Sequence, residues 1–316
     1  MIPSVRKAQI YSLRASATLR ETFLIIIACG VTWATAVDAG AGEGGMSKEH
    51  QQMQAELQQI VDNLDGSLGL VVEDLAGEHR FAIDADRQFK QASCIKIPIL
   101  LEVLKQADEG KFSLADRQWV EKQNKTSGSG ILVELGDRTV ELSVEDLCVL
   151  MCLASDNTAT NMLIDRIGKE NVTATMATLG CDKTILGRRM MDTAAAARGE
   201  ENYSTPADAA RILRTLHEGK FVNREVSDHA LAILRKAKSG AIRSTVPMSV
   251  PVVCKSGEIP GVLTEWALVE LAGRPYIVVV MGSYDPRRTT DDPLDEAMKQ
   301  VGKVAYKFFK PRTVAK

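Results

Sequence analysis

The sequence has few of the residues that usually build metal or redox sites. Its 316 residues include only four histidines and six cysteines. None of the histidines falls in a metal-ligand spacing, none has a nearby Ser or Cys motif, and the chain contains no Cys-x-x-Cys pair. A zinc site, a redox dithiol and a Ser-His-Asp triad are therefore not expected. The sequence predicts neither a metal nor an organic cofactor.

An excess of charge of one sign is also absent. Lys and Arg total 39 against 41 Asp and Glu, which gives a net charge of −2, and the basic residues are spread along the chain. Nucleic acid is therefore not an expected partner. With 45% hydrophobic and 25% charged residues, the composition is typical of a soluble globular protein with a sizeable core. Nothing in the composition indicates an oligomeric state.

Residues 1–45 differ from the rest of the chain. Four basic residues precede an apolar run at 23–37, which is short and rich in small residues, and Ala-Thr-Ala at 34–36 offers a cleavage site. We therefore expect a signal peptide followed by a linker, with the mature protein periplasmic or extracellular and without a stable membrane span. Two alternatives remain open: Met46 is the true first residue, or cleavage leaves a lipid anchor at Cys29.

The pattern of apolar residues predicts an α+β fold. Helical periodicity occurs at 47–64, 95–104, 142–167, 205–216 and 294–309. Strands are expected at 68–72 and 79–83, as a hairpin, and at 250–254, 263–271 and 276–281. Strands from both ends can share one antiparallel sheet, with the terminal helices covering a face. We expect an α/β lobe from 46–90 and 240–312, a helical lobe from 91–239, and a ligand site in the cleft between them.

Three short motifs occur in order along the expected mature chain. They are Ser-Cys-Ile-Lys at 93–96, Ser-Asp-Asn at 155–157 and Lys-Ser-Gly at 255–257. The first and third patterns each occur a second time, at 4–7 and 238–240. Those copies lie in the expected signal and at the end of a helical run, whereas Lys-Ser-Gly at 255–257 follows an apolar strand. Context therefore selects the three motifs.

These residue types suit acyl transfer. Ser93 at a helix start and Lys96 one turn later lie on one helix face. A serine hydroxyl needs a neighbouring base before it is a good nucleophile, and Lys96 is such a base if burial and nearby cations lower its pKa. Lys255 supplies a second positive charge, Ser155 is placed to relay a proton to a leaving nitrogen, and Asn157 offers an amide to the substrate. Backbone N–H groups at the helix start suit a developing oxyanion.

Together the motifs resemble the signature of class A β-lactamases and penicillin-binding proteins. Their separations, 62 residues from Ser93 to Ser155 and 100 from Ser155 to Lys255, are similar to those of class A β-lactamases. The resemblance covers roughly residues 46 to 312. Further matching segments are Ser-Asp-Asn-Thr-Ala-Thr-Asn at 155–161, Thr-Pro at 205–206 and Arg-Ser-x-x-Pro at 243–247.

The resemblance implies the two-lobe serine β-lactamase fold and a β-lactam or a peptidoglycan-derived peptide as the small-molecule substrate. It implies an acyl-enzyme on Ser93 and an oxyanion hole at the backbone N–H groups of Ser93 and Glu258. With Asn157 and the motif Lys255-Ser256-Gly257, Glu258 completes the expected substrate-binding set.

One catalytic residue of that family has no counterpart here. Class A β-lactamases carry an Ω-loop glutamate that positions the water for hydrolysis of the acyl-enzyme, and the matching position falls at or next to Met190. Methionine cannot act as a general base. Asp192 is a candidate replacement, whereas Glu200 and Glu201 are expected to pair with the arginines at 188–189. Acylation should survive this change, and turnover is expected to be slow.

The arginine that usually binds the substrate carboxylate is also missing. The strand after Lys-Ser-Gly reads Val-Leu-Thr-Glu-Trp at 262–266, and Ala241 occupies the other common place. Arg287 and Arg288 are candidate substitutes, or a solvated pair in a loop. Three functions therefore remain open: a β-lactam hydrolase with slow deacylation, a cell-wall peptidase or esterase of the same fold, and a sensor that is acylated without turnover.

Overall fold

The computed structural model describes residues 47–288 and 292–310, and the expected signal peptide lies outside them. A five-stranded antiparallel sheet in the order β2-β1-β9-β8-β7 organises this part of the chain. Strand β1 pairs with β9 along its whole length, so strands from both ends of the sequence share one sheet, as predicted. The strands are β1 (Ser67–Asp74), β2 (Arg80–Ile83), β7 (Val252–Ile259), β8 (Val262–Val269) and β9 (Tyr276–Ser283).

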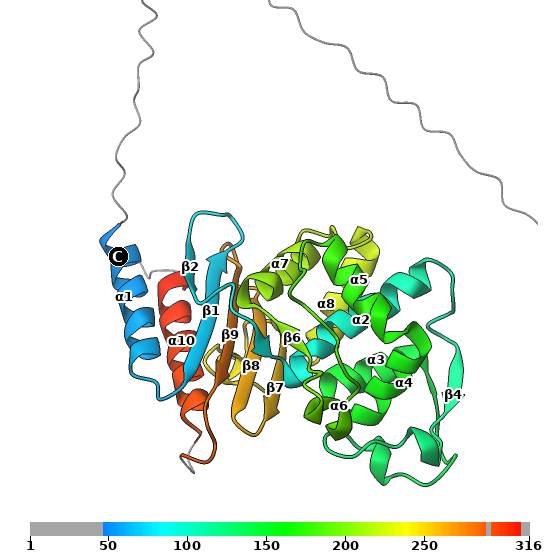
Figure 1. Ribbon diagram of the computed structural model, residues 1–316. Helices are drawn as coiled ribbons and strands as arrows, with labels where there is room; N and C mark the ends of the chain where they lie inside the picture. The colour runs from blue at the N-terminus through cyan, green and yellow to red at the C-terminus, as the bar shows by residue number, and fades with distance from the viewer. Residues whose placement is uncertain (1–46, 289–291, 311–316) are drawn as a thin grey trace, which may run out of the picture. The chain divides into compact units, whose positions relative to one another are not determined.

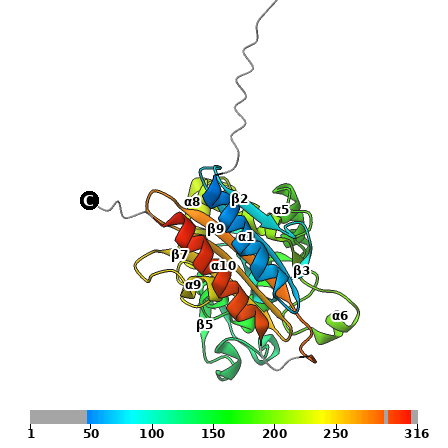
Figure 2. The ribbon, with the colours of Figure 1, turned by 90° about the vertical axis from the view of Figure 1, so that its left-hand side faces the viewer.

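Helices α1 (Lys48–Asp62) and α10 (Pro293–Phe309) lie side by side over one face of the sheet (Figures 1 and 2). Successive side chains of a strand point to opposite faces of the sheet, so every second residue packs under these two helices. In β9, Tyr276, Val278 and Val280 belong to the core under these two helices, and the residues between them belong to the core on the other face. The buried stripe of α10 includes Leu294, Met298, Val301 and Ala305 and ends on Phe309, whereas Phe308 is only half-buried.

The second face of the sheet packs against the helical part of the chain (Figure 1). Helix α2 is buried along nearly all of its length, which fits its almost continuous apolar sequence. None of the helices in 47–288 and 292–310 is long and apolar enough to cross a membrane. The helices here are α2 (Lys96–Asp108), α3 (Val144–Leu153), α4 (Asn157–Ile167), α5 (Lys169–Thr178), α6 (Thr193–Ala197), α7 (Pro206–His217), α8 (Arg224–Leu234) and α9 (Ala241–Ser244).

Short elements complete the helical part. Two small antiparallel pairs, β3–β6 and β4–β5, and three 3₁₀ turns connect the helices. The five cysteines in the described residues are all buried and unpaired, and two of them, Cys148 and Cys152, lie on α3. The short elements are β3 (Phe89–Lys90), β4 (Arg117–Trp119), β5 (Glu141–Ser143), β6 (Tyr203–Ser204), η1 (Ala92–Ile95), η2 (Lys122–Asn124) and η3 (Leu132–Glu134).

Three of the departures from the sequence prediction lie at the motifs. The helical stretch at 142–167 is broken between α3 and α4, where Ser155 has a φ of 52°. Ser93 lies in the 3₁₀ turn η1 rather than at an α-helical start. Strand β7 continues through Lys255, Ser256 and Gly257, because the whole segment pairs with β8. The α+β class is confirmed, and the departures from regular periodicity mark the places where the three motifs meet.

Candidate active site

Hydrogen bonds from the sheet hold the turn that carries Ser93. The side chain of Gln91 accepts from Trp266 Nε1 at 3.0 Å, and its backbone carbonyl accepts from Thr264 Oγ1 at 3.1 Å. All three of these residues are buried. Ala92, next to the serine, has a φ of 43°, a left-handed conformation that costs a non-glycine residue energy and persists only where the surroundings impose it. The sheet therefore fixes the position of Ser93.

Gly257 brings strand β7 unusually close to this turn. A Cβ at Gly257 would lie 2.6 Å from both Ser93 N and Gln91 O and 2.8 Å from Cys94 N. Real Cβ atoms do not tolerate these distances to backbone, so only glycine fits here. Glycine at this position lets strand β7 lie directly against the turn. The backbone N–H of Ser93 is therefore beside the strand that continues into Glu258. The expected oxyanion-hole residues are therefore neighbours.

The hydroxyl of Ser155 is the centre of the polar network. It lies 2.8 Å from Ser93 Oγ, to which it donates, and it accepts from Lys96 Nζ at 3.0 Å and from Lys255 Nζ at 3.2 Å. Within the described residues, no hydrogen bond joins Lys96 Nζ directly to Ser93 Oγ, so the lysine reaches the serine through Ser155. The structure thus brings together residues from all three motifs, with Ser155 in the middle.

Lys96 is fully buried, and among the described residues its ammonium group donates to neutral acceptors alone: Ser155 O at 2.6 Å, Ser155 Oγ at 3.0 Å and Asn157 Oδ1 at 2.9 Å. Burial, and then the nearby charge of Lys255, lower the pKa of Lys96 to about 7. Burial also lowers the pKa of Lys255. An amine with a pKa near neutrality is suited to accept a proton, as the sequence predicted for Lys96.

The Ser-Asp-Asn motif also has a structural part that the sequence prediction missed. Asp156 Oδ2 accepts from the backbone N–H groups of Ile131 and Leu132 at 2.7 and 2.9 Å, while its Oδ1 caps α4. The amide of Asn157 donates to Ser127 O at 2.9 Å. Asp156 and Asn157 therefore hold the loop at 127–132 against the site, and Asn157 also orients Lys96.

A pocket of about 240 Å³ opens onto these groups. It lies where the 3₁₀ turn, the junction of α3 and α4, and strand β7 meet. Ser239 also lines it, although the sequence alone gave no reason to place the second Lys-Ser-Gly copy near the site. The lining residues are Ser93, Ser129, Cys152, Leu153, Ala154, Ser155, Ala237, Ser239, Lys255, Ser256 and Glu258.

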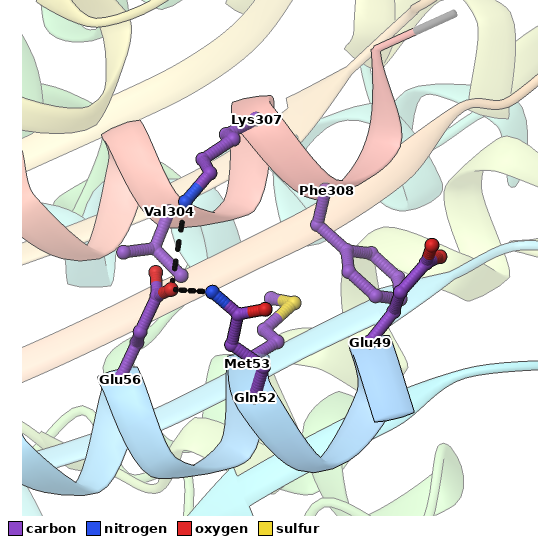
Figure 3. A pocket seen from close by; sticks show the side chains of 7 residues that line it. All are labelled: Glu49, Gln52, Met53, Glu56, Val304, Lys307 and Phe308. Atoms are coloured by element: carbon purple, nitrogen blue, oxygen red, sulfur yellow. Dashed lines mark hydrogen bonds and ion pairs between the residues drawn. The ribbon is translucent and has the colours of Figure 1, made fainter. Parts of the chain in front are cut away.

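A second depression, of about 280 Å³, lies between α1 and α10 (Figure 3). Glu56 reaches across it to Lys307 at 3.5 Å and accepts from Gln52 at 2.8 Å. Its lining includes no serine, threonine, cysteine or histidine that could act as a nucleophile. The pocket at Ser93 is therefore the better candidate for the reaction.

Met190 lies in an apolar setting next to helix α4. Its backbone is held by Asn161, which accepts from Met190 N at 2.9 Å and donates to Met190 O at 3.1 Å. Asn161 is one helical turn after Asn157, and the Met190 side chain is buried. Asp192, the candidate replacement base, accepts from Ala195 N at 2.8 Å and so caps α6. Its carboxylate already has a structural partner.

The remaining carboxylates of this segment form ion pairs. Glu201 pairs with Arg188 at 2.9 Å, which confirms one of the expected pairs. Glu200 pairs with Arg198 at 2.7 Å instead of with the arginines at 188–189. Neither glutamate lines the pocket at Ser93.

Arg287 and Arg288 do not reach the pocket. Arg287 is largely exposed and pairs with Asp285 at 2.8 Å, and Arg288 pairs with Asp65 at 3.3 Å. Of the two interpretations left open by the sequence, the structure favours a solvated loop. The polar residues that line the pocket include Lys255, Ser239 and Ser256.

Glu265 lies directly opposite Ser256 across the β7–β8 pair, in the strand where the family usually places an arginine. It is buried and accepts from the backbone N–H groups of Ile242 and Arg243 at 2.9 and 3.1 Å. Burial raises its pKa to about 7. Glu265 thus fixes the short helix α9 against the sheet, a function that its sequence position did not reveal.

Comparisons with known proteins agree with this geometry. An imipenem-hydrolysing β-lactamase from Enterobacter cloacae is 25% identical over 258 residues, which cover 79% of this chain and 87% of that enzyme. The crystal structure of a β-lactamase from Sphaerobacter thermophilus superimposes with a TM-score of 0.73 at 29% identity, over 81% of this chain and 96% of that one. An ancestral class A β-lactamase matches with a TM-score of 0.73 at 27% identity, over 81% and 99%.

The family model described as "Beta-lactamase enzyme family" matches residues 52–309, which include all three motifs and nearly all of the described structure. The matched residues include the five-stranded sheet and most of the helices that cover it. The chain belongs to the beta-lactamase enzyme family and is a serine hydrolase of the class A β-lactamase type.

Proposed function

We propose that this protein is acylated rapidly by β-lactams at Ser93 and releases the product slowly. The observation that carries the proposal is the chain of hydrogen bonds from Ser93 through Ser155 to Lys96. It joins a nucleophile to a buried amine whose pKa is lowered to about 7. The pocket in front of Ser93 has room for a small bicyclic amide and is lined by hydroxyl and ammonium groups.

In the proposed acylation step, neutral Lys96 takes the proton of Ser93 by way of the Ser155 hydroxyl. Ser93 Oγ attacks the β-lactam carbonyl carbon, and the backbone N–H groups of Ser93 and Glu258 stabilise the oxyanion. The intermediate then collapses: the C–N bond breaks, Ser155 gives its proton to the leaving nitrogen, and Lys96 returns a proton to Ser155. The positive charge of Lys255 favours the negatively charged substrate and the oxyanion throughout.

Deacylation lacks a comparable base in this proposal. The position expected to carry the water-activating glutamate holds Met190, whose side chain is apolar and buried, and Asp192 is engaged as a helix cap. Loss of a well-placed general base typically slows a step by about 10² to 10⁴ fold. The acyl-enzyme should therefore accumulate.

Intact-mass spectrometry after addition of penicillin G tests the proposal. We expect an adduct of one penicillin within seconds and its slow loss over minutes to hours. An adduct that never clears would favour the sensor, and a well-folded protein that forms none would refute the proposal and favour the peptidase or esterase. Ser93→Ala is the matched control, because it removes one oxygen and should abolish the adduct. Labelling of that variant would show that another residue is the nucleophile.

Met190→Glu tests the explanation for slow release. The backbone of residue 190 is already held by Asn161, so a glutamate there would start from a fixed position. We expect deacylation to become at least tenfold faster while the acylation rate stays within about threefold, because only the second step gains a base. Met190→Gln, of similar size but without a carboxylate, is the control. Equal acceleration by both variants would contradict the assignment.

We also propose that residues 1–45 direct export and are removed, leaving residues 46–312 as the catalytic domain in the periplasm or outside the cell. This proposal depends on the basic and apolar pattern of the first residues. The N-terminal sequence of protein recovered from the culture or periplasm checks it. A mature chain that begins at Cys29 and carries lipid would favour the lipoprotein alternative, and full-length cytoplasmic protein would refute export.

A further inference from the structure

Four groups that commonly bind metals converge at the turn between β1 and β2. Asp74, Glu78 and His79 each place a ligand atom within 4.8 Å of the other two. His50, from the first turn of α1, places its Nδ1 3.4 Å from Nδ1 of His79. The chain has only four histidines, so half of them meet here from segments 29 residues apart.

Asp74 gives this cluster a feature that surface acidic groups lack. It is 1% exposed, and its Oδ1 accepts from Glu78 N at 2.9 Å, whereas its buried Oδ2 has no hydrogen-bond partner in the described structure. A buried carboxylate oxygen that has lost its contact with water destabilises the fold unless another group satisfies it. A cation held with Glu78 and His79 would satisfy Oδ2.

The spacing of the two histidines fits a specific kind of ion. In a tetrahedral zinc site with Zn–N bonds of about 2.0–2.1 Å, two ligating nitrogens stand about 3.3–3.4 Å apart. The Nδ1 atoms of His50 and His79 are 3.4 Å apart, a separation that fits a shared ion and, without one, a hydrogen bond between the rings. Both rings are held in place, His50 by stacking on Phe81 at 4.3 Å and His79 by edge-on contact with Phe308 at 5.1 Å.

We propose that Asp74, Glu78 and His79 bind one divalent transition-metal ion of the zinc type, with His50 beside His79 as the candidate fourth ligand. The site joins α1 to the β1–β2 hairpin. Asp74 follows Leu70 and Val72 at alternate positions of β1, so its side chain points to the same face of the sheet as theirs. That face is the one that α1 and α10 cover. Ser93 belongs to the opposite side, so the ion stabilises the fold rather than taking part in acyl transfer.

The test uses purified, untagged protein that has been treated with EDTA and dialysed. Zinc is added, and bound metal is measured by equilibrium dialysis alongside the melting temperature. We expect one zinc ion per chain and a melting temperature that rises with zinc concentration. Glu78→Gln and His79→Ala should each weaken binding at least tenfold. Glu78 is exposed in a turn, so its replacement leaves the fold intact. His50→Ala should also weaken binding.

His217→Ala is the matched control, since it removes a histidine from α7, outside the cluster. It should bind zinc as the unchanged protein does. Absence of zinc binding by the unchanged protein would overturn the proposal, and so would equal binding by the Glu78, His79 and His217 variants. Activity toward β-lactams is not needed for any of these outcomes, so the result is independent of the function proposed for Ser93.

Discussion

The pH dependence of acylation gives the most direct test of the base at Ser93. In the structure, Lys96 is buried among neutral acceptors and its pKa falls from the ordinary value of 10.5 to about 7. The charged form of Lys96 cannot accept the proton of Ser93. Acylation should therefore be slow where Lys96 is protonated and should reach a plateau where it is neutral.

The lowering of the pKa of Lys96 is large enough to control the rate of acylation at neutral pH. At pH 7.5 an amine with a pKa of 10.5 is neutral in about 0.1% of molecules, whereas one with a pKa near 7 is neutral in about three-quarters of them. The structure thus raises the population of the active base roughly 700-fold at that pH. Because Lys96 and Lys255 interact, the midpoint belongs to the pair of lysines rather than to either alone.

The assay is the second-order rate of adduct formation with penicillin G, measured by quenched-flow mass spectrometry from pH 5.5 to 9.5. We expect a rise of about tenfold per pH unit below the midpoint near 7 and a plateau above it. Far-UV circular dichroism at each pH shows that the fold is unchanged across the range. A rate that is flat from pH 6 to 9, or that rises with a midpoint near 10, would refute Lys96 as the base.

Two further substitutions test the parts of the site around the lysine. Ser155→Ala removes the hydroxyl that links Lys96 to Ser93. The acylation rate should fall about 10² to 10⁴ fold, with little change in melting temperature. An unchanged rate would show that Lys96 reaches Ser93 directly. Gly257→Ala places a Cβ 2.6 Å from backbone atoms, so thermal unfolding should show a loss of about 1–3 kcal/mol together with slower acylation. A normal melting temperature for that variant would contradict the close approach of β7.

The fold could be predicted largely from hydrophobic periodicity. The apolar run at 276–281 and the helical periodicity at 294–309 predicted β9 and α10, because the sheet and its helices are regular. The prediction was less accurate where a local contact overrides periodicity. Residues 142–167 look continuously helical, yet the chain breaks at Ser155 because Asp156 caps a new helix and binds two backbone N–H groups of the 131–132 turn.

The site residues could be proposed from their types and order, but their connections could not. A Ser-x-x-Lys spacing suggests that Lys96 contacts Ser93, whereas the structure places Ser155 between them. That arrangement depends on the left-handed conformation of Ser155, which a sequence pattern does not encode. The position of Glu265 could not be predicted from the sequence either. Its burial beside α9 depends on the register between β7 and β8, which is set only when the sheet assembles.

The histidines illustrate the limit most clearly. His50 and His79 are too far apart in sequence for a ligand motif, and their spacing predicted no metal site. Their nitrogen atoms meet because α1 crosses the sheet next to the β1–β2 turn, which is a consequence of packing between elements. Sequence spacing detects ligands that share one element, and it misses those that tertiary structure brings together.

The two buried lysines also explain why the surroundings of Ser93 are so tightly constrained. Neither Lys96 nor Lys255 has a carboxylate as a hydrogen-bond acceptor in the described structure; their acceptors are serine and asparagine oxygens. Burial without a carboxylate partner favours the neutral form of Lys96, so Lys255 supplies the positive charge of the site. The hydrogen bond from Trp266 to Gln91 and the close contact at Gly257 hold Ser93 against the strand that carries Lys255. An oxyanion formed at Ser93 meets this charge in a site that does not need to rearrange, which favours the transition state of acylation.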